Sequence, residues 1–225
     1  MTMKKGVKSA AATKKKKVQD CASALSNLGD LSDQCAATAI DLSGQYPPIQ
    51  VMDSILKDCT SCEKLSLSTN NIDRIQNLSD TMPLKILSVG RNGIRKLDGI
   101  QPVAGTLEQL WISYNAIERL EGIECLQKLN VLYMSNNKIS DWQEIDRLSC
   151  LPHLSDVLFI GNPLYKRYQK KNNLAEYTQE MMKRLPHLKK LDGTILQATL
   201  TDEEDEEENN GDDTTNQGRE GLENE

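Results

Sequence analysis

The chain has 225 residues and a formal net charge of -6, and 38% of its residues are hydrophobic. This length suits one substantial domain with a core of its own. The sequence has no run of about 18 apolar residues, and no apolar stretch follows its lysine-rich start, so neither a membrane span nor a secretory signal is expected. We therefore expect a cytoplasmic protein.

The chain is predicted to begin with a basic disordered tail, residues 1–20, which contains seven lysines and few apolar residues. Residues 21–61 are predicted to form a helical cap and a half-repeat, with a short helix near residues 53–59. One weak amphipathic helix, which contains Gly29, a residue unfavourable inside a helix, is indicated upstream. Its apolar positions are Val18, Ala22, Leu25, Leu28 and Cys35.

Five similar segments follow in residues 62–165. They are CEKLSLSTNNI from Cys62, LKILSVGRNGI from Leu84, LEQLWISYNAI from Leu107, LNVLYMSNNKI from Leu129 and LSDVLFIGNPL from Leu154. Each fits LxxLxLxxNxL, the leucine-rich-repeat pattern. The marker asparagines are spaced by 22, 23, 22 and 25 residues; they are Asn70, Asn92, Asn115, Asn137 and Asn162.

Each repeat is predicted to contribute one strand and one return segment. Apolar residues at positions 4 and 6 alternate with polar ones, as in a strand with one buried face. Apolar residues spaced by three then favour short 3-10 or helical turns. The asparagine is expected to bond backbone groups where the strand ends. The predicted fold is an α/β leucine-rich-repeat solenoid of the 22-residue class, with a concave parallel sheet, convex helical turns and helical caps.

Residues 166–198 are predicted to form a carboxy-terminal cap helix and a terminal repeat fragment, LKKLDG from Leu188. One face of the helix is marked by Leu174, Tyr177, Met181 and Leu185, and Pro186 ends it. Residues 199–225 contain twelve acidic residues and are predicted to be a disordered tail.

Enzyme chemistry is not indicated. The two histidines, His153 and His187, occur in two copies of LPHL at the same phase of the repeat, which favours duplication over catalysis. Cys59 and Cys62 form a CxxC motif without a second ligand pair, so buried thiols are expected rather than a zinc site. We predict no catalytic residues, no metal and no cofactor.

Positions 3, 5, 7 and 8 of each repeat are predicted to face outward on the concave side. Because adjacent parallel strands lie about 4.8 Å apart, position 5 would place Trp111, Tyr133 and Leu158 side by side. Exposed aromatic patches of this kind typically bind proteins. The alternative is that a terminal helix or tail of the chain covers this face. The predicted partner-binding residues are Ile86, Arg91, Trp111, Ser113, Tyr114, Val131, Tyr133, Ser135, Asn136, Leu158 and Ile160.

A second candidate surface is basic. It would suit an acidic partner such as tubulin, and a solvated cap face is the alternative. Its residues are Lys166, Arg167, Lys170, Lys171, Lys183 and Arg184, with Lys189 and Lys190 nearby.

Over about residues 47–193, the sequences of the predicted strands resemble one family of these repeats more closely than the general repeat pattern requires. The segments that carry the resemblance are EKLSLSTN from Glu63, LSVGRN from Leu87, LWISYN from Leu110, LYMSNN from Leu132, GNPL from Gly161 and LKKLDG from Leu188. The chain resembles the leucine-rich-repeat light chains of axonemal outer-arm dynein.

This resemblance implies a non-catalytic subunit of the ciliary or flagellar motor that resides in the axoneme. It implies binding to a dynein heavy chain near the microtubule-binding tip of its stalk, and regulation of motility. Tubulin is a further candidate partner, whereas nucleic acid, membrane and small-molecule substrates are not expected. Two alternatives stay open: a nuclear acidic repeat protein that binds histones or acts as a chaperone, or another repeat adaptor, including a paralogue with a different heavy chain.

Overall fold

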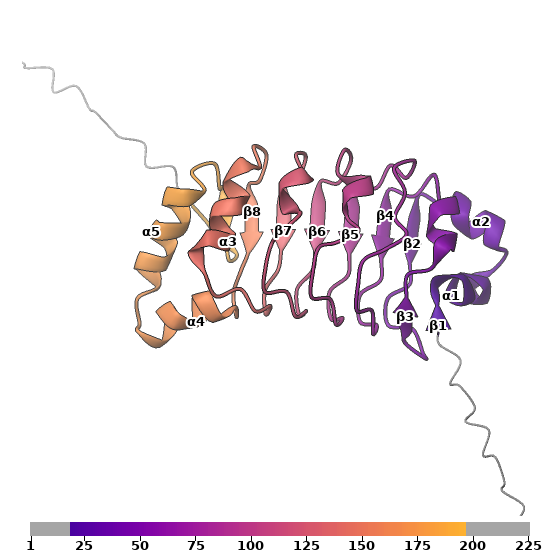
Figure 1. The fold of residues 1–225 in the computed structure, drawn as a ribbon, viewed down its shortest axis with the longest axis horizontal. Coiled ribbons are helices and arrows are strands. Elements are labelled where there is room, and N and C mark those ends of the chain that lie inside the picture. The colour runs from indigo at the N-terminus through magenta and orange to yellow at the C-terminus, as the bar shows by residue number, and fades with distance from the viewer. Residues whose placement is uncertain (1–18, 197–225) are drawn as a thin grey trace, which may run out of the picture.

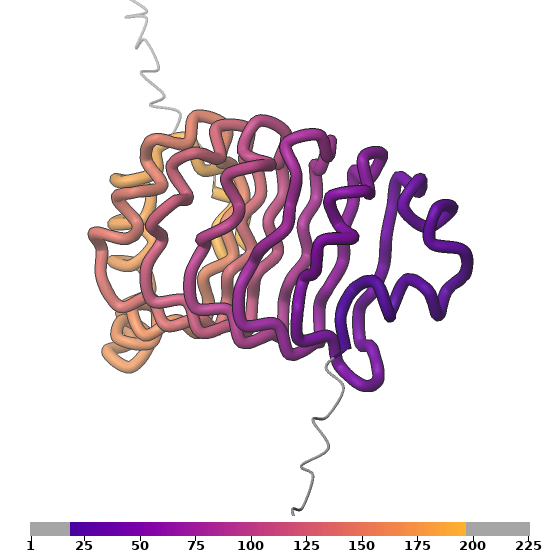
Figure 2. Tube along the Cα trace, turned by 45° about the vertical axis from the view of Figure 1, so that its right-hand side comes forward, coloured from indigo at the N-terminus to yellow at the C-terminus, as the bar shows by residue number. Residues whose placement is uncertain are grey.

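A computed structural model describes residues 19–196, in which the chain winds through a row of similar turns (Figure 1). The predicted tails, residues 1–20 and 199–225, lie outside this range except for Gln19 and Asp20. Successive turns stack side by side like the coils of a spring (Figure 2). No helix within residues 19–196 is both long enough and apolar enough to cross a membrane.

The turns share one sheet of eight strands in the order β10-β9-β8-β7-β6-β5-β4-β2. The strands are β2 (Ala39–Asp41), β4 (Lys64–Ser66), β5 (Ile86–Ser88), β6 (Gln109–Trp111), β7 (Val131–Tyr133), β8 (Asp156–Leu158), β9 (Lys190–Leu191) and β10 (Thr194–Ile195). All neighbours from β2 to β9 are parallel, and only β10 turns back antiparallel to β9. The predicted parallel sheet of a leucine-rich-repeat solenoid is confirmed.

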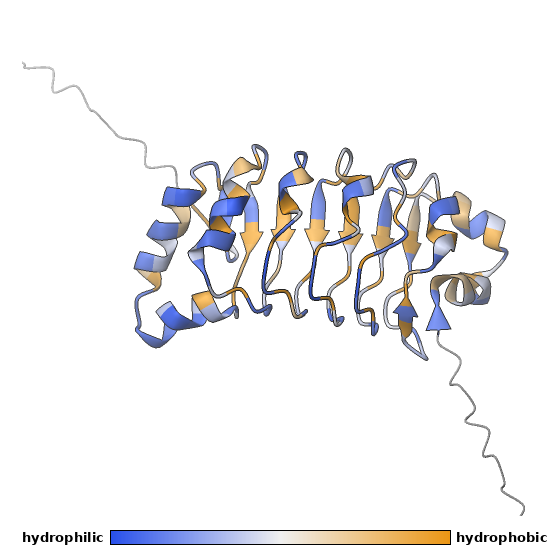
Figure 3. Cartoon of the chain, viewed as in Figure 1, coloured by the Kyte–Doolittle hydropathy of each residue, from blue (hydrophilic) through white to orange (hydrophobic). Residues whose placement is uncertain are grey.

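The core lies between the sheet and the return segments. The middle residue of each short strand points inward, so Leu87 pairs with Leu110 and Leu110 with Leu132, all at most 1% exposed. The flanking residues point outward, and the hydropathy colouring shows polar and apolar segments alternating around each turn (Figure 3). Each repeat therefore buries its apolar face only against its neighbours, as expected of a solenoid.

A column of asparagines closes the turn after each strand. The Asn137 side chain accepts a bond from the backbone N–H of Ile117 at 3.1 Å and donates to the carbonyls of Ile112 and Met134 at 3.0 and 3.1 Å. The other marker asparagines make equivalent bonds; they are Asn70, Asn92, Asn115 and Asn162. The predicted structural role of the asparagines is confirmed.

Short helical turns return the chain in three of the repeats. They are η2 (Gln101–Val103), η3 (Ile123–Cys125), and α3 (Trp142–Asp146) followed by η4 (Arg147–Cys150). Each buries an apolar residue at the predicted spacing of three, such as Ile123 and Leu148. The segment between β4 and β5 contains no helix, although its apolar residues have the same spacing.

The amino-terminal cap differs from the single helix that the sequence predicts. Two helices form, α1 (Cys21–Leu28) and α2 (Leu31–Ala36), because Gly29 between them adopts φ of 152°. This break leaves Leu28 52% exposed instead of buried. The 3-10 helix η1 (Ser54–Asp58) lies where a short helix is predicted, and β1 (Gln19–Asp20) pairs with β3 (Ile49–Val51).

At the other end, α4 (Pro163–Lys170) and α5 (Leu174–Arg184) cover the last repeat. The helix α5 is confirmed, but Leu174, expected on its buried face, is 37% exposed because it begins the helix at the margin of the contact. Tyr177 of α5 is buried against Tyr165 and Tyr168 of α4, at ring centroid distances of 5.3 and 5.9 Å.

The carboxylate of Asp192, just after β9, takes the place of a strand carbonyl beside the last repeat. In earlier repeats the residue after the strand donates its N–H to a carbonyl of the next strand, as Met134 does to Leu158 at 2.9 Å. The neighbouring strand β9 ends at Leu191, so Phe159 donates instead to Asp192 Oδ1 at 2.5 Å, while the Tyr177 hydroxyl donates to Oδ2 at 3.2 Å. Burial raises the pKa of Asp192, and these hydrogen bonds oppose the shift.

We expect Asp192→Asn to be at least as stable as the wild type at neutral pH. The amide retains the acceptor for Phe159 and removes a buried charge. Because the folded pKa is raised, protonation of Asp192 stabilises the wild type at low pH, and this contribution is lost as pH rises through the folded pKa. Urea unfolding at several pH values should show the variant's relative stability falling as pH is lowered towards 3.8, the ordinary pKa of the carboxyl group. A constant difference across pH would contradict this expectation.

Candidate functional site

The concave face, the side of the sheet turned away from the core, carries the predicted column of position-5 residues. Ser88 pairs with Trp111, Trp111 with Tyr133, and Tyr133 with Leu158. The side chains change from small and polar to large and apolar along this row. The half-buried Val131 and the exposed Ile160 lie in the neighbouring columns. We call the group Trp111, Val131, Tyr133, Leu158 and Ile160 the apolar patch.

Two aromatic rings form the centre of the apolar patch. Trp111 and Tyr133 stack with centroids 6.1 Å apart and planes 22° from parallel. The Tyr133 hydroxyl donates to Asp156 Oδ2 at 2.9 Å, and Lys190 Nζ lies 3.3 Å from the same oxygen. Burial and the bond to Asp156 raise the pKa of Tyr133. The rings are therefore held in place before any partner arrives.

The rim beside the apolar patch has an unusual backbone. Arg91, Tyr114 and Asn136 occupy position 8 and all have positive φ, between 53° and 58°. This conformation is uncommon for residues other than glycine. The Arg91 guanidinium lies over the Tyr114 ring, 4.3 Å from its centroid, and Tyr114 is exposed. In these three repeats the turn thus presents one planar side chain beside the sheet.

The structure brings the predicted concave residues together on one face, with one correction. Ser135 is only 7% exposed, because it lies between neighbouring strands and its N–H donates to Ser113 Oγ at 3.1 Å. It therefore supports the rim instead of forming it. Ile86 is half-buried two strands away from Tyr133, at the far margin of the patch. Trp111 stays 39% exposed, so nothing within residues 19–196 covers the face.

The predicted basic residues gather on the carboxy-terminal cap. Lys166, Arg167, Lys170 and Lys171 are exposed on α4 or at its end, and Lys183 is exposed on α5. Much of both helices is hydrophilic (Figure 3).

Arg184 differs from these cations, which form no ion pair within residues 19–196, although Arg167 donates to the Ser140 carbonyl at 3.0 Å. Arg184 pairs with Glu180 and, at 3.0 Å, with Asp146, and it lies over the Trp142 ring at 4.4 Å. These neighbours hold Arg184 half-buried as a link between the cap and the last return segment, so an acidic partner would find it already paired.

A small hollow joins the apolar patch to the cap. It has a volume of 240 Å³ and is lined by Ile160, Tyr165, Leu174, Tyr177 and Leu196, among others. Ile160 belongs to both features, so the apolar surface continues from the sheet towards α4 and α5. Sequence reasoning did not identify this hollow, because its walls come from separate elements.

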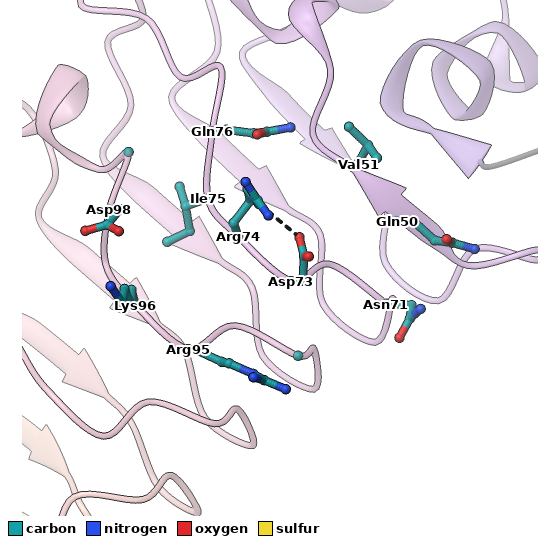
Figure 4. A pocket seen from close by; sticks show the side chains of 12 residues that line it. Gln50, Val51, Asn71, Asp73, Arg74, Ile75, Gln76, Arg95, Lys96 and Asp98 are labelled. Carbon is teal, nitrogen blue, oxygen red and sulfur yellow. Dashed lines mark hydrogen bonds and ion pairs between the residues drawn. The ribbon is translucent and has the colours of Figure 1, made fainter.

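A larger hollow lies elsewhere, among the loops that follow β3, β4 and β5. It measures 1080 Å³, and its lining includes Asp73, Arg74, Arg95, Lys96 and Asp98 (Figure 4). All five charged side chains are exposed, and Arg74 pairs with Asp73 at 3.4 Å. Groups in open solvent like these lack the desolvation that usually activates a catalytic side chain.

No group of three or more His, Cys, Asp or Glu side chains within residues 19–196 is arranged to hold a metal ion. All six cysteines are free, and Cys59 Sγ lies 3.2 Å from Cys35 Sγ in the amino-terminal cap. Burial raises the pKa of Cys62 to about 11, so its reactive thiolate is scarce at neutral pH. His153 and His187 are exposed and border one 640 Å³ hollow, which agrees with their equal phase in the repeat.

Comparison with known proteins identifies the family. The family model for leucine-rich repeats (2 copies) matches residues 106–147. The chain is 54% identical to dynein axonemal light chain 1 of Chlamydomonas reinhardtii over 157 residues, which are 70% of this chain and 79% of that protein. The chain belongs to the dynein axonemal light chain 1 family. The human dynein axonemal light chain 1 is 50% identical over 158 residues, covering 70% and 82% of the two chains.

Among solved structures, a leucine-rich-repeat protein of Leptospira interrogans superposes with a TM-score of 0.53 at 23% identity. It covers 71% of this chain and 38% of its own, and it supports the fold alone. Membership of the dynein axonemal light chain 1 family favours a dynein light chain over the nuclear acidic repeat protein that the sequence left open.

Proposed function

We propose that the chain is a non-catalytic light chain of an axonemal outer-arm dynein and that its apolar patch binds a dynein heavy chain. The observation that carries this proposal is the stacked pair of the exposed Trp111 and the half-buried Tyr133 on the outer face, in a chain about half identical to dynein axonemal light chain 1. Membership of the family supports assembly with axonemal dynein, and the apolar patch is a surface suited to binding a polypeptide.

The physical case depends on the cost of leaving this surface in water. Aromatic side chains at the centre of an interface commonly contribute most of the binding energy, because they bury large apolar areas with few rotatable bonds. Tyr133 is already fixed by Asp156, so little conformational freedom is lost on binding. The polar residues around the patch, Arg91, Ser113 and Asn136, provide the hydrogen-bonding rim that such interfaces have.

We further propose that the bound region of the heavy chain lies near the microtubule-binding tip of its stalk, so that the light chain adjusts motor attachment and motility. The resemblance of the strand segments supports this location. The exposed cations of α4 would meet an acidic surface, with tubulin as the candidate. The protein would then reside in the axoneme of a cilium or flagellum.

A pull-down from axonemal extract tests the patch. The wild-type chain should recover one large heavy chain, and Trp111→Ala should lose it. Lys64→Ala is the matched control, because Lys64 is exposed on β4 of the same sheet but outside the patch. Recovery of the heavy chain by Trp111→Ala would indicate that the heavy chain binds a surface other than the apolar patch. Fluorescent tagging in a ciliated cell tests the assembly separately, since a nuclear signal would contradict a dynein light chain.

A further inference from the structure

The carboxy-terminal cap carries cations that have no ion-pair partner within residues 19–196. Six of them define what we call the basic cap surface: Lys166, Arg167, Lys170, Lys171, Lys183 and Lys189. The stretch from Pro163 to Lys171 contains four of these cations and no acidic residue. By contrast, the neighbouring Arg184 and Lys190 are paired with Glu180 and Asp156.

Lys166 and Lys170, and likewise Arg167 and the C-cap residue Lys171, are four residues apart along α4. Like charges at this spacing on a helix repel each other, and an anionic ligand would relieve the repulsion. Single exposed ion pairs contribute only about 0–1 kcal/mol, whereas several cations facing one flexible polyanion act together. The basic cap surface therefore suits a run of carboxylates better than an isolated acidic residue.

The chain itself leaves the described structure beside this surface. β10 pairs with β9, and the Leu196 N–H donates to the Lys189 carbonyl at 2.8 Å, which fixes the last described residue against the cap. Leu196 lines one hollow with Lys189 and another with Tyr165, the neighbour of Lys166 in α4. Leu196 is thus close to both α4 and α5.

The sequence that follows is a polyanion. Residues 202–208 are seven consecutive acidic residues, and residues 200–225 hold twelve acidic residues against a single arginine. The six residues from Leu196 to Asp202 span up to about 20 Å when extended, and the twelve residues to Glu208 span up to about 40 Å. The acidic run can therefore reach α4 and α5 without any movement of the solenoid.

We propose that residues 202–208 bind the basic cap surface of their own molecule and shield it from acidic partners. The charges are complementary, and the attachment at Leu196 keeps the acidic run at an effective concentration in the millimolar range. Binding of this kind is weak and salt-sensitive, because exposed charges are screened beyond about 8–10 Å at physiological ionic strength. The surface would open when an acidic partner competes or when the acidic run is neutralised. This inference does not depend on the apolar patch.

The test uses the full chain and a fluorescent ten-residue polyglutamate peptide as the probe, in low salt. In one variant the seven acidic residues 202–208 are replaced by Asn or Gln. We expect this variant to bind the probe about ten-fold more tightly than the wild type, with the difference abolished in high salt. Adding Lys166→Ser, Lys170→Ser and Lys171→Ser should remove the gain, because those side chains are exposed and form the binding surface.

A matched control separates binding from a general change in net charge. Glu206→Gln, Glu207→Gln and Glu208→Gln remove three charges from the acidic run. Asp98→Asn, Glu118→Gln and Glu121→Gln remove three exposed charges from the return segments instead. Only the first set should tighten probe binding and shift the backbone amide resonances of α4 and α5.

Equal probe binding by the wild type and the seven-residue variant, with unchanged α4 resonances, would overturn the proposal. Resonance shifts that grow with protein concentration would also overturn it, because they would assign the acidic run to a second copy of the chain.

Discussion

Replacing Asn137 with alanine is expected to lower the free energy of unfolding by about 3 kcal/mol or more. The Asn137 side chain is 6% exposed and satisfies the N–H of Ile117 and the carbonyls of Ile112 and Met134. Alanine leaves these backbone groups without partners in a place that water reaches poorly. Each unsatisfied buried group costs about 1–3 kcal/mol.

Urea unfolding followed by circular dichroism measures this effect. Asn130→Ala is the matched control, because Asn130 is an exposed asparagine whose side chain accepts one bond, from the Ser155 hydroxyl at 2.8 Å. We expect the control to lie within about 1 kcal/mol of the wild type. A similar small loss for Asn137→Ala would show that the asparagine column is not required for stability.

The second large effect concerns binding. Trp111→Ala and Tyr133→Ala should each weaken binding of the heavy chain by about 2 kcal/mol or more, roughly 30-fold, while the chain remains folded. Neither ring belongs to the core, since Trp111 is 39% exposed and Tyr133 half-buried on the outer face. The loss therefore reflects the interface and not the stability of the solenoid.

The two rings should not act independently. Because they stack at 6.1 Å, truncating one also removes support from the other, and contacting residues commonly show coupling of about 0.5–3 kcal/mol. The double variant is thus expected to lose less than the sum of the single losses. Titration of a purified heavy-chain fragment with all four proteins measures the coupling. Near wild-type affinity for both single variants would show that the apolar patch is not part of the interface.

The repeat pattern made most of the fold predictable. A fixed spacing of the marker asparagines determines which residues share a column, so the neighbours of Trp111 on either side followed without coordinates. The asparagine bonds were predictable for the same reason, since every strand ends in the same turn. Where the pattern repeats, local sequence and global fold specify the same arrangement.

The parts that the sequence did not predict depend on contacts outside the repeat. The helix α4 has few apolar residues, and its first residue, Pro163, still belongs to the last repeat segment. Arg184 meets Asp146, which lies 38 residues earlier in the sequence, through the packing of α5 on α3. Such contacts depend on how the carboxy-terminal cap packs against the last repeat, and the periodicity of the repeat sequence does not predict them.

The burial of Ser135 has a similar origin. Position 7 is an outward position in the pattern, but the bond from the Ser135 backbone to Ser113 and the larger side chains nearby leave the serine little contact with solvent. Outward direction follows from the pattern, whereas exposure depends on the size of the adjacent side chains. The partner-binding role of the concave residues remains a prediction.

The in-register pairing of Trp111, Tyr133 and Leu158 limits what shape of ligand the sheet can engage. Successive strands are about 4.8 Å apart, whereas one turn of an α-helix rises about 5.4 Å. If a straight helix lay across the strands, the offset between its turns and the strands would grow by about 0.6 Å per repeat. About three neighbouring repeats could therefore contact successive turns of the helix before this offset becomes too large. A straight helix could therefore use only a short apolar stripe on the sheet, and additional repeats in the solenoid would not strengthen its binding.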